Sequence, residues 1–371
     1  MSGSIHPSIE SLSLLPGCVW TQSGRPILSR VGLTSLDNRG EEPLKAAVLR
    51  AVEDLVIDDI PAPEAPAPGW VQVAVRAVGI CGSDVHYYQE GAIGSFVLRQ
   101  PMILGHEVGG VITAVGEGVD LPVGTVVALE PGIPCGKCPQ CRQGRYNLCP
   151  DVQFFATPPV DGAMTERVNH PAAFTYPANG LTPEEASLAE PLSVGIAAVG
   201  KAALHLGERA LILGAGPVGL LTALAADAEG AVVTLCDVQV DRLTVAEQLG
   251  FSTLVFDAQR DAAYDAVIDC SGSGQAVAWG QRVVRPGGRI ILVGMGAAGA
   301  VQLDGLDLCL REVSVRGVFR YANTFPAAIE LLRRRRDVLP VFTGHRIALA
   351  ELPECLRTGS FRSHVKTLVI L

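Results

Sequence analysis

The sequence predicts an α/β protein built from a β-rich domain and a doubly wound parallel sheet. Between residues 45 and about 185, short alternating or apolar runs are separated by Pro and Gly, which is typical of an antiparallel, loop-rich β domain. From about Leu192 the period lengthens, and six strand-like runs alternate with helical stretches, as in a doubly wound parallel sheet. The final run, HVKTLVIL, has no place in a six-stranded sheet, so we expect the chain to return to the first domain at its end.

The first domain follows an N-terminal extension. Residues 1–43 are polar and rich in Ser, Gly and Pro, and they show no period that indicates a role. Alternation then predicts five strands, with a Pro-rich connection, PAPEAPAPG, after the second: KAAVLRA, LVIDDI, WVQVAVRAVGI, VGGVITAVG and VGTVVALE. We assign residues 44–191 and 325–371 to this domain.

The second domain spans residues 192–324. Its six strand candidates are, in chain order, RALILGAG, AVVTLCD, STLVF, YDAVIDCSG, GGRIILVGM and VSVRGVF. Helical stretches such as VDRLTVAEQLG lie between them, as crossovers between parallel strands require. The last candidate, VSVRGVF, is expected at an open edge of the sheet, which makes it a candidate for pairing with a second copy of the chain.

The composition is that of an acidic globular protein. Of the 371 residues, 48% are hydrophobic and 18% are charged, and the formal net charge is −9. An acidic chain repels phosphate backbones, so we expect no nucleic-acid partner. The basic run at residues 333–336 is interpreted as the exposed C-terminal end of a helix rather than as a polyanion-binding patch.

No targeting or membrane segment is evident in the sequence. The first thirty residues lack a basic start followed by an apolar run. The longest apolar stretch, residues 210–226, is interrupted by Gly and Pro and is short for a membrane span. We therefore expect a cytoplasmic protein with no membrane partner.

The segment LILGAGPVGLL carries a glycine motif typical of dinucleotide binding. Gly214, Gly216 and Gly219 form GxGxxG between an apolar strand and an Ala/Leu-rich helix. They permit a tight turn, close approach of a pyrophosphate to backbone N–H groups, and close packing of the helix on the strand. The N-terminus of the helix adds positive potential. The alternative is a Gly-rich turn in an ordinary βαβ unit.

An acidic residue follows at the expected distance. Asp237 ends the run AVVTLCD, eighteen residues beyond Gly219, where a carboxylate accepts hydrogen bonds from the adenosine ribose and repels a 2′-phosphate. We therefore predict NAD rather than NADP. The residues expected at the cofactor are Gly214, Gly216, Pro217, Val218, Gly219, Asp237 and Arg242.

Four of the ten cysteines lie within residues 135–149. Cys135, Cys138, Cys141 and Cys149 are spaced C-x2-C-x2-C-x7-C. Short gaps let sulfurs in a tight loop converge on one ion, and four thiolates complete a tetrahedron with no open position, as in structural zinc sites. An iron–sulfur cluster is the competing metal, and free thiols are the remaining alternative.

A second cluster combines Cys81, His106 and Glu107. Cys81 and His106 are 25 residues apart, and each lies beside Gly at the end of an apolar run. A thiolate, an imidazole and a carboxylate form a reasonable zinc set that leaves room for water or substrate. Spacing alone leaves open that these are ordinary core residues.

Resemblance to a known family adds weight to these interpretations. GICGSDVHYY, PMILGHEVGG and EPLSVGI together resemble the zinc-dependent medium-chain dehydrogenases. Within that family, GSDVHYY followed by GxIG, FFATPP, EPLSVGI and GVFRYANT resemble the sorbitol and xylitol dehydrogenase branch. The similarity covers about residues 45–371. It implies a GroES-like catalytic domain for the first domain and a Rossmann domain for the second.

The resemblance also implies roles for individual residues. Cys81, His106 and Glu107 would hold a catalytic zinc, and the cysteine quartet matches the family's structural-zinc lobe. Glu190 falls where many alcohol dehydrogenases have a cysteine ligand, and in the polyol branch a glutamate there reaches the metal directly or through water. Ser83 and His86 match the proton relay. The positions that match the polyol pocket are Tyr87, Phe154, Thr157, Arg320 and Tyr321.

Purely structural roles remain open for four of these residues. Glu190, beside a proline, is also suited to capping a helix. Arg320 also suits a surface ion pair, and Tyr87 and Phe154 also suit a hydrophobic core.

The reaction implied by the resemblance is zinc- and NAD-dependent oxidation of a polyol to a ketose. Xylitol to D-xylulose and D-sorbitol to D-fructose are the leading candidates. An alkoxide would form at the zinc, a hydride would pass to NAD, and the proton would leave through Ser83 and His86. A homodimer or homotetramer is expected.

Two alternatives remain at this point. A related zinc dehydrogenase would act on L-idonate, L-threonine or L-arabinitol, with Arg320 pairing with a carboxylate where the substrate has one. A non-enzymatic NAD-binding protein on the same scaffold is the alternative from another class.

Overall fold

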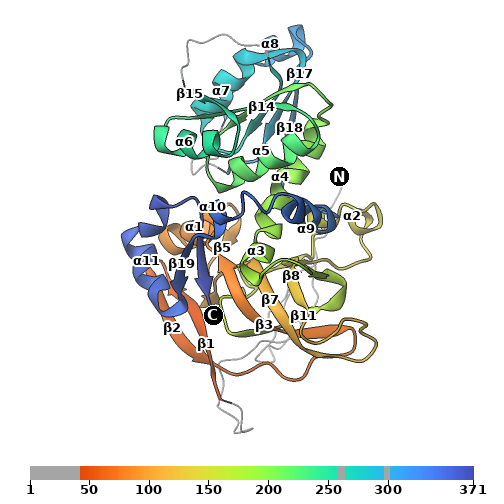
Figure 1. The fold of residues 1–371 in the computed structure, drawn as a ribbon, viewed down its shortest axis with the longest axis vertical. Helices are drawn as coiled ribbons and strands as arrows, with labels where there is room; N and C mark the ends of the chain where they lie inside the picture. The colour runs from red at the N-terminus through yellow and green to blue at the C-terminus, as the bar shows by residue number, and fades with distance from the viewer. Residues whose placement is uncertain (1–41, 257–263, 296–300) are drawn as a thin grey trace, which may run out of the picture. The chain divides into compact units, whose positions relative to one another are not determined.

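The computed structural model describes residues 42–256, 264–295 and 301–371. These residues form a β-rich part and a parallel-sheet part, and the α/β fold class predicted from the sequence is confirmed (Figure 1). The predicted N-terminal extension, apart from its last two residues, lies outside the described residues. Among the described residues, no helix is long and apolar enough to cross a membrane.

The β-rich part is organised around a seven-stranded sheet. Its strands, in spatial order, are β12 (Thr175–Pro177), β8 (Val126–Leu129), β7 (Glu107–Val115), β3 (Trp70–Gly79), β20 (Thr367–Ile370) and β19 (His345–Ala348), with β11 (Arg167–Pro171) also paired to β3. The run HVKTLVIL supplies β20, which pairs antiparallel with β3 through Leu368 and Gly79. The end of the chain therefore returns to the β-rich part and joins the sheet that contains β3.

Smaller elements surround this sheet. The short strands form three further sheets: β2 (Asp54–Ile60), β1 (Leu44–Ala51) and β6 (Met102–Ile103); β10 (Gln153–Phe154) and β9 (Gly132–Ile133); β4 (Ala92–Ile93) and β5 (Phe96–Val97). The helices are α1 (Gly82–Glu90), α2 (Pro139–Arg142), α3 (Pro183–Ser187), α9 (Phe325–Arg334), α10 (Pro340–Thr343) and α11 (Leu352–Thr358). The basic run at residues 333–336 ends α9, and its arginines pair with acidic neighbours.

The second part is a six-stranded parallel sheet. Its order is β15 (Ser252–Val255), β14 (Val232–Asp237), β13 (Arg209–Leu213), β16 (Tyr264–Asp269), β17 (Val284–Leu292) and β18 (Ser314–Gly317). The connecting helices are α5 (Pro217–Ala228), α6 (Val240–Gln248), α7 (Gly274–Val283) and α8 (Gly305–Leu310). The strand order reverses at β13 and β16, and ligands of such sheets bind beyond the carboxyl ends of the strands at this point.

The central strand shows why this sheet is buried on both faces. Ile212 packs into one apolar cluster, whereas Leu211 and Leu213 pack into another on the opposite face. Because side chains alternate along a strand, an uninterrupted apolar run such as RALIL fits only a strand covered on both sides. All six predicted strands of this domain are present in the structure.

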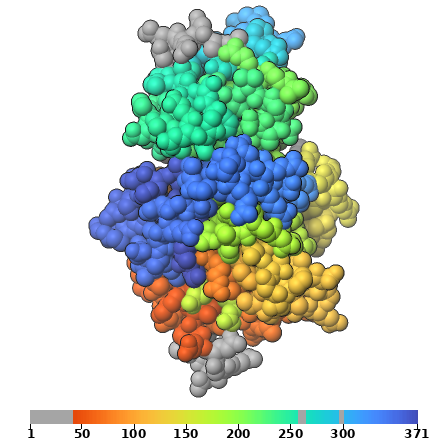
Figure 2. Space-filling view, viewed as in Figure 1, coloured from red at the N-terminus to blue at the C-terminus, as the bar shows by residue number. Residues whose placement is uncertain are grey.

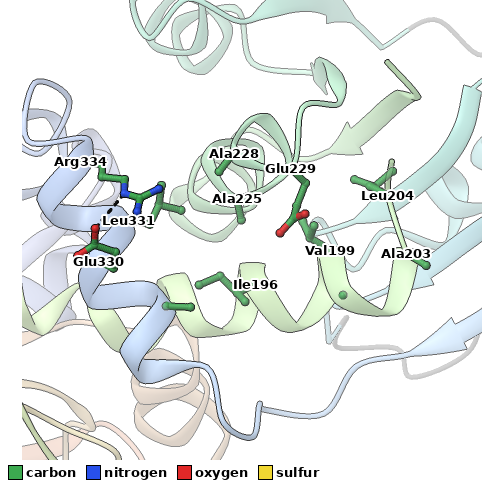
Figure 3. Close-up of a pocket in the computed structure, with 12 residues that line it drawn as sticks. Ile196, Val199, Ala203, Leu204, Ala225, Ala228, Glu229, Glu330, Leu331 and Arg334 are labelled. Carbon is green, nitrogen blue, oxygen red and sulfur yellow. Dashed lines mark hydrogen bonds and ion pairs between the residues drawn. The ribbon is translucent and has the colours of Figure 1, made fainter. Parts of the chain in front are cut away.

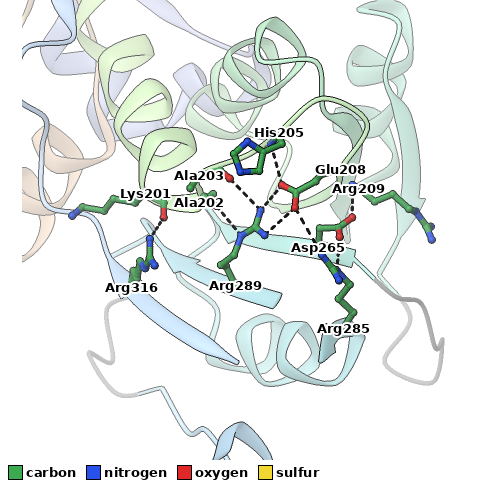
Figure 4. Close-up of polar contacts among 10 residues, drawn as sticks. All are labelled: Lys201, Ala202, Ala203, His205, Glu208, Arg209, Asp265, Arg285, Arg289 and Arg316. Atoms are coloured by element: carbon green, nitrogen blue, oxygen red, sulfur yellow. Dashed lines mark hydrogen bonds and ion pairs between the residues drawn. The ribbon is translucent and has the colours of Figure 1, made fainter. Parts of the chain in front are cut away.

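A long helix, α4 (Ala189–Ala202), joins the two parts (Figure 1). Its C-terminal carbonyl groups are capped by arginines of the parallel sheet, as Figure 4 shows. Arg289 donates to Ala202 O at 2.8 Å, and Arg316 donates to Lys201 O at 2.8 Å. A positive charge at this end of a helix is stabilising, because the last carbonyl groups have no partner within the helix. The other end of α4 carries Glu190.

Candidate functional site

The candidate metal ligands come from two loops that one carboxylate holds together. Cys81 is the N-cap residue of α1, and Gly105, with a φ of +90°, precedes His106. The side chain of Asp84, in the first turn of α1, accepts hydrogen bonds from Cys81 N at 2.9 Å and from Gly105 N at 3.0 Å. Asp84 is buried, so it fixes the two loops to each other without competition from water.

The three predicted ligands meet at one point. One ligand atom from each of Cys81, His106 and Glu107 lies within 4.8 Å of the others, and His106 and Glu107 are buried. Burial alone lowers the pKa of His106, but the charge and hydrogen bond of Cys81, followed by the charge of Glu190, raise it to about 10. The surroundings therefore favour a cation, and thiolate, imidazole and carboxylate donors suit Zn²⁺. Cys81, His106 and Glu107 are therefore suitable ligands for Zn²⁺.

Glu107 has a second partner that the sequence did not predict. Lys366, which directly precedes the last strand, donates to Glu107 Oε1 at 2.6 Å and to Ile80 O at 2.9 Å, and the side chains of Lys366 and Glu107 are buried. Gly79 makes room for the carboxylate, since an added Cβ would lie 1.9 Å from Glu107 Oε2. Glu107 is therefore shared between the ligand cluster and a buried ion pair.

Glu190 lies in the same buried group of charges but outside the three-residue cluster. Burial raises its pKa to about 7, the charge of His106 opposes this, and the charge of Glu107 adds to it. Its Oε1 accepts a hydrogen bond from Tyr321 Oη at 2.6 Å. Glu190 therefore contacts Tyr321 from the first turn of α4, rather than capping a helix end through its side chain.

The five predicted pocket residues are brought together. Arg320 Nη2 donates to Thr157 Oγ1 at 3.3 Å, and its guanidinium lies 3.8 Å from the ring centroid of Phe154. Burial raises the pKa of Tyr87 to about 12, while the charge of Arg320 and a hydrogen bond with Thr157 act in the opposite direction. Tyr321 lines the same small cavity as Phe154 and Arg320. Arg320 is thus not a surface ion-pair partner.

The predicted relay residues lie on one face of α1, and both are partly buried. Ser83 and His86 are three residues apart on this helix, so their side chains share one face. His86 is partly exposed, and its Nδ1 lies 3.4 Å from Glu90 Oε1. The structure therefore places both residues on the helix that begins at Cys81, with His86 toward solvent.

The cysteine quartet also converges. One sulfur from each of the four residues lies within 4.8 Å of the others. Backbone N–H groups point at the sulfurs: Cys135 N donates to Cys149 Sγ at 3.3 Å, and Cys141 N donates to Cys138 Sγ at 3.4 Å. Hydrogen bonds from the N–H groups of Lys137 and Cys138 lower the pKa of Cys135 to about 7. Four converging sulfurs, with N–H groups directed at two of them, form a closed set that fits a structural zinc.

The glycine motif has the geometry that a dinucleotide needs. Gly214 has a φ of +98°, and an added Cβ at Gly219 would lie 1.8 Å from Gly214 O, whereas the Cβ position of Gly216 is open. Gly216 is the N-cap residue of α5, so the open space beside it lies at the N-terminus of this helix, where a phosphate would bind. Pro217 and Val218 form the first turn of α5.

The predicted acidic residue supports this loop as well. Asp237 ends β14, and its carboxylate accepts hydrogen bonds from Ala215 N at 2.8 Å and Gln239 N at 2.9 Å. Arg242 is more loosely placed, with Nη1 3.8 Å from Asp237 Oδ2 and an exposed side chain.

A separate pocket holds none of the predicted site residues. It has a volume of about 450 Å³ and is lined by α4, α5 and α9, with Val199, Ala225 and Leu331 among its walls (Figure 3). No predicted ligand, cofactor or substrate residue lines it. We therefore place the candidate site at the metal ligands rather than at this hollow.

Several residues of the site were missed by sequence reasoning. Asp84 and Lys366 hold the ligand loops, and Phe96 lies beside Arg320, with the guanidinium 5.9 Å from its ring centroid. Glu130 is a buried carboxylate held by two tyrosines. For Asp84 a signal exists, because an acidic side chain three residues after the N-cap residue is a capping position. The roles of Lys366, Phe96 and Glu130 depend on contacts between segments that are distant in the sequence.

Comparisons with known proteins agree with this geometry. Residues 67–180 match the model for the alcohol dehydrogenase GroES-like domain, and residues 217–334 match the model for zinc-binding dehydrogenases. A sorbitol dehydrogenase of Bacillus subtilis is 41% identical over 78% of this chain and 86% of its own length. A sorbitol dehydrogenase of Arabidopsis thaliana is 41% identical over 84% of this chain and 90% of its own.

A solved structure is similar over the same span. The L-idonate 5-dehydrogenase of Escherichia coli has a TM-score of 0.80 and 29% identity, covering 88% of this chain and 98% of that one. The two domain matches and the extent of the sequence identity establish the family. The chain belongs to the zinc-dependent medium-chain dehydrogenases, and it is an oxidoreductase rather than a non-catalytic dinucleotide-binding protein.

Proposed function

We propose that this enzyme oxidises a secondary hydroxyl of a polyol to a ketone, with NAD as the acceptor. Activity on polyols is supported by relatives that carry the name sorbitol dehydrogenase. Xylitol to D-xylulose and D-sorbitol to D-fructose are the reactions that we infer. The observation that carries this choice is the polar, partly aromatic set of Tyr87, Thr157, Arg320 and Tyr321 beside the metal ligands.

These side chains suit a substrate with several hydroxyl groups. Burial lowers the pKa of Arg320 to about 10, so its guanidinium stays charged at neutral pH and offers strong hydrogen-bond donors. A buried site with such donors discriminates strongly against a substrate that lacks hydroxyls, because the donors are then left unpaired. Ethanol is therefore expected to be a poor substrate.

The reacting carbon would lie between the metal ligands and the dinucleotide. Cys81, His106 and Glu107 would hold zinc, which acts as a Lewis acid and makes a bound alcohol more acidic. The hydroxyl of Ser83 would take up the released proton and pass it toward His86, whose partly exposed ring can exchange it with solvent. Glu190 would orient the substrate together with Tyr321.

The cofactor is inferred to be NAD. The carboxylate of Asp237 already accepts two backbone hydrogen bonds and lies at the end of β14, where the adenosine ribose of a bound dinucleotide is expected. A 2′-phosphate would meet this negative charge at close range. NADP should therefore support a much lower rate than NAD.

The direct test is NADH formation by the purified protein. The panel is xylitol, D-sorbitol, ribitol, L-arabinitol, L-idonate, L-threonine and ethanol, each with NAD and with NADP, and each with and without a metal chelator. We expect a chelator-sensitive rate on one or two polyols, with ethanol near zero. A rate on ethanol equal to that on polyols would contradict the proposed role of Arg320 and Tyr321.

A second candidate function is oxidation of a hydroxy acid. Arg320 would then bind a carboxylate, and the similarity to an L-idonate 5-dehydrogenase favours this alternative. L-threonine belongs to the same class, whereas L-arabinitol would be a different polyol. Replacing Arg320 with Lys separates the cases, because a point charge retains part of the affinity for a carboxylate but loses the forked hydrogen bonds to neighbouring hydroxyls.

A further inference from the structure

The segment that carries Arg320 and Tyr321 is held by the cysteine loop. We define the substrate segment as residues 319–323 and the cysteine loop as residues 135–149. Asn147 Nδ2 donates to Phe319 O at 2.8 Å, and Asn323 Nδ2 donates to Gly144 O at 2.9 Å. These two bonds join the first and last residues of the substrate segment to the loop, although more than 170 residues separate the partners along the chain.

A third bond reaches a buried carboxylate. Tyr146 Oη accepts a hydrogen bond from Asn323 N at 2.7 Å and donates to Glu130 Oε1 at 2.7 Å. Glu130 is buried, and its other oxygen accepts from Tyr176 Oη at 2.9 Å. The hydroxyl of Tyr146 is thus fixed on one side by a charged acceptor and holds the substrate segment on the other.

The backbone of the substrate segment needs such support. Arg320 has a φ of +54°, in the left-handed region that residues other than Gly and Asn rarely adopt, and Asn323 has a φ of +61°, which asparagine tolerates. A strained conformation of this kind persists only where its surroundings hold it. The loop supplies contacts at residues 319 and 323, on either side of Arg320 and Tyr321.

Little free space separates the loop from the segment. The cavity between them has a volume of about 10 Å³ and is lined by both, with Tyr146, Asn147, Arg320 and Tyr321 among its walls. This is at most about the space of one water molecule. A shift of the loop is therefore transmitted to the segment rather than absorbed by a gap.

We propose that the cysteine loop positions the substrate-binding side chains, with Tyr146 and Asn147 as its positioning residues. Tyr146 and Asn147 lie between Cys141 and Cys149, so the positions of the four sulfurs constrain where these two side chains lie. The role in substrate recognition rests on the proposed function of Arg320 and Tyr321. The mechanical link between loop and segment does not.

The first test compares two substitutions that remove the same chemical group. Tyr146→Phe and Tyr176→Phe each delete one hydroxyl bonded to Glu130, but only the hydroxyl of Tyr146 contacts the substrate segment. Hydrogen–deuterium exchange of the amides of residues 319–323 in the zinc-loaded protein is the readout. Exchange should be about fivefold faster in Tyr146→Phe, because a local opening becomes easier, and unchanged in Tyr176→Phe.

A second pair of variants tests the hydrogen bond between Asn147 and Phe319. Asn147→Ala removes the bond to Phe319 O, whereas Gln140→Ala in the same loop removes only a bond to Arg145. The first should accelerate exchange in residues 319–323, and the second should not. Equal exchange in all four variants and the wild type, or equal acceleration within each pair, would overturn the proposal.

The kinetic test uses the same variants. In Tyr146→Phe the KM for the polyol should rise about tenfold, the loss expected for one hydrogen bond, while kcat and the KM for NAD change little. Tyr176→Phe should keep the wild-type KM for the polyol. If the wild type oxidises no polyol, the proposed function fails, and the exchange experiment still decides whether the loop holds the segment.

Discussion

Asp84 joins the two loops that carry Cys81 and His106, and its loss should release the metal at that centre. Asp84→Ala removes the bonds to Cys81 N and Gly105 N, and groups that orient metal ligands typically contribute about 10- to 100-fold to metal affinity. Asp84→Asn keeps one acceptor and should be intermediate. The measurement is the zinc content per chain after titration with a chelator.

The cysteine quartet serves as the internal control for this substitution. Asp84 does not contact it, so one zinc per chain should remain bound in Asp84→Ala at chelator concentrations that remove the other. Retention of both ions at the wild-type chelator concentration would show that Asp84 does not support the catalytic metal.

His170 should make the protein sensitive to acid. Burial lowers its pKa from 6.5 to about 4. Above pH 6.5 neither the folded nor the unfolded chain binds this proton, and the folded state keeps its full stability. As the pH falls from 6.5 to 4, the unfolded chain binds a proton that the folded chain excludes, which lowers the free energy of unfolding by up to about 3 kcal/mol.

A substitution isolates this contribution from other acid effects. The free energy of unfolding is measured by denaturant titration between pH 7.5 and 4.5 in the wild type, His170→Gln and His205→Gln. His170→Gln should flatten the profile, whereas His205→Gln, which changes an exposed side chain, should follow the wild type. Parallel profiles for His170→Gln and the wild type would contradict the assignment.

At the scale of single elements, the capping of α4 should be a measurable source of stability. Arg289 is largely buried, donates to Ala202 O and forms two hydrogen bonds with Glu208 at 3.0 and 2.5 Å. Replacing it with Met should cost about 2 kcal/mol, since charge-assisted bonds in a partly buried site are lost and a carboxylate loses its main partner. Thermal denaturation of the metal-loaded protein measures the effect.

Arg285 offers the matched comparison for Arg289. It pairs closely with Asp265 and more loosely, at 3.8 Å, with Glu208, and its side chain is 47% exposed. Arg285→Met should cost about 0.5 kcal/mol or less, as is usual for exposed ion pairs. Equal losses for the two substitutions would mean that the end of α4 contributes nothing beyond a surface charge pair.

The elements also show which parts of the fold a sequence can predict. The parallel strands were found because a strand buried on both faces is an uninterrupted apolar run, as in RALIL. Helix α1 was missed because GSDVHYYQE has no apolar period, and its limits depend on local bonds. It begins where Asp84 binds Cys81 N and ends at Gly91, which has a φ of +69°.

The same distinction between local patterns and distant contacts applies to the candidate site. The cysteine quartet could be named from its spacing alone, whereas Cys81, His106 and Glu107 were named through the resemblance to zinc-dependent dehydrogenases, because their spacing also fits core residues. Lys366 and Glu107 lie 259 residues apart, and Tyr146 and Asn323 lie 177 apart. No local pattern links such partners, since they meet only after the last strand and the substrate segment have packed.

At the scale of the whole molecule, we propose that the chain forms a homo-oligomer through the edge of the parallel sheet. Strand β18 is the last strand of that sheet, and its outer edge has no paired strand among the described residues. On the face drawn in Figure 2, the light-blue segment that includes α8 lies at the surface. Helix α8, close in sequence before β18, exposes 70% of Leu306 and 77% of Leu310. An open strand edge beside exposed leucines is typical of a surface that a second copy covers.

Charges introduced at these leucines should separate the subunits. In the double variant Leu306→Glu and Leu310→Glu, the mass measured by light scattering after size-exclusion chromatography should fall from that of a dimer or tetramer to a smaller species, because burying the carboxylates in an interface is costly. Leu206→Glu changes another exposed leucine, which is outside β18 and α8, and should leave the mass unchanged. A wild-type protein with the mass of one chain would refute the proposed oligomer, and an unchanged mass in the double variant would move the interface away from α8.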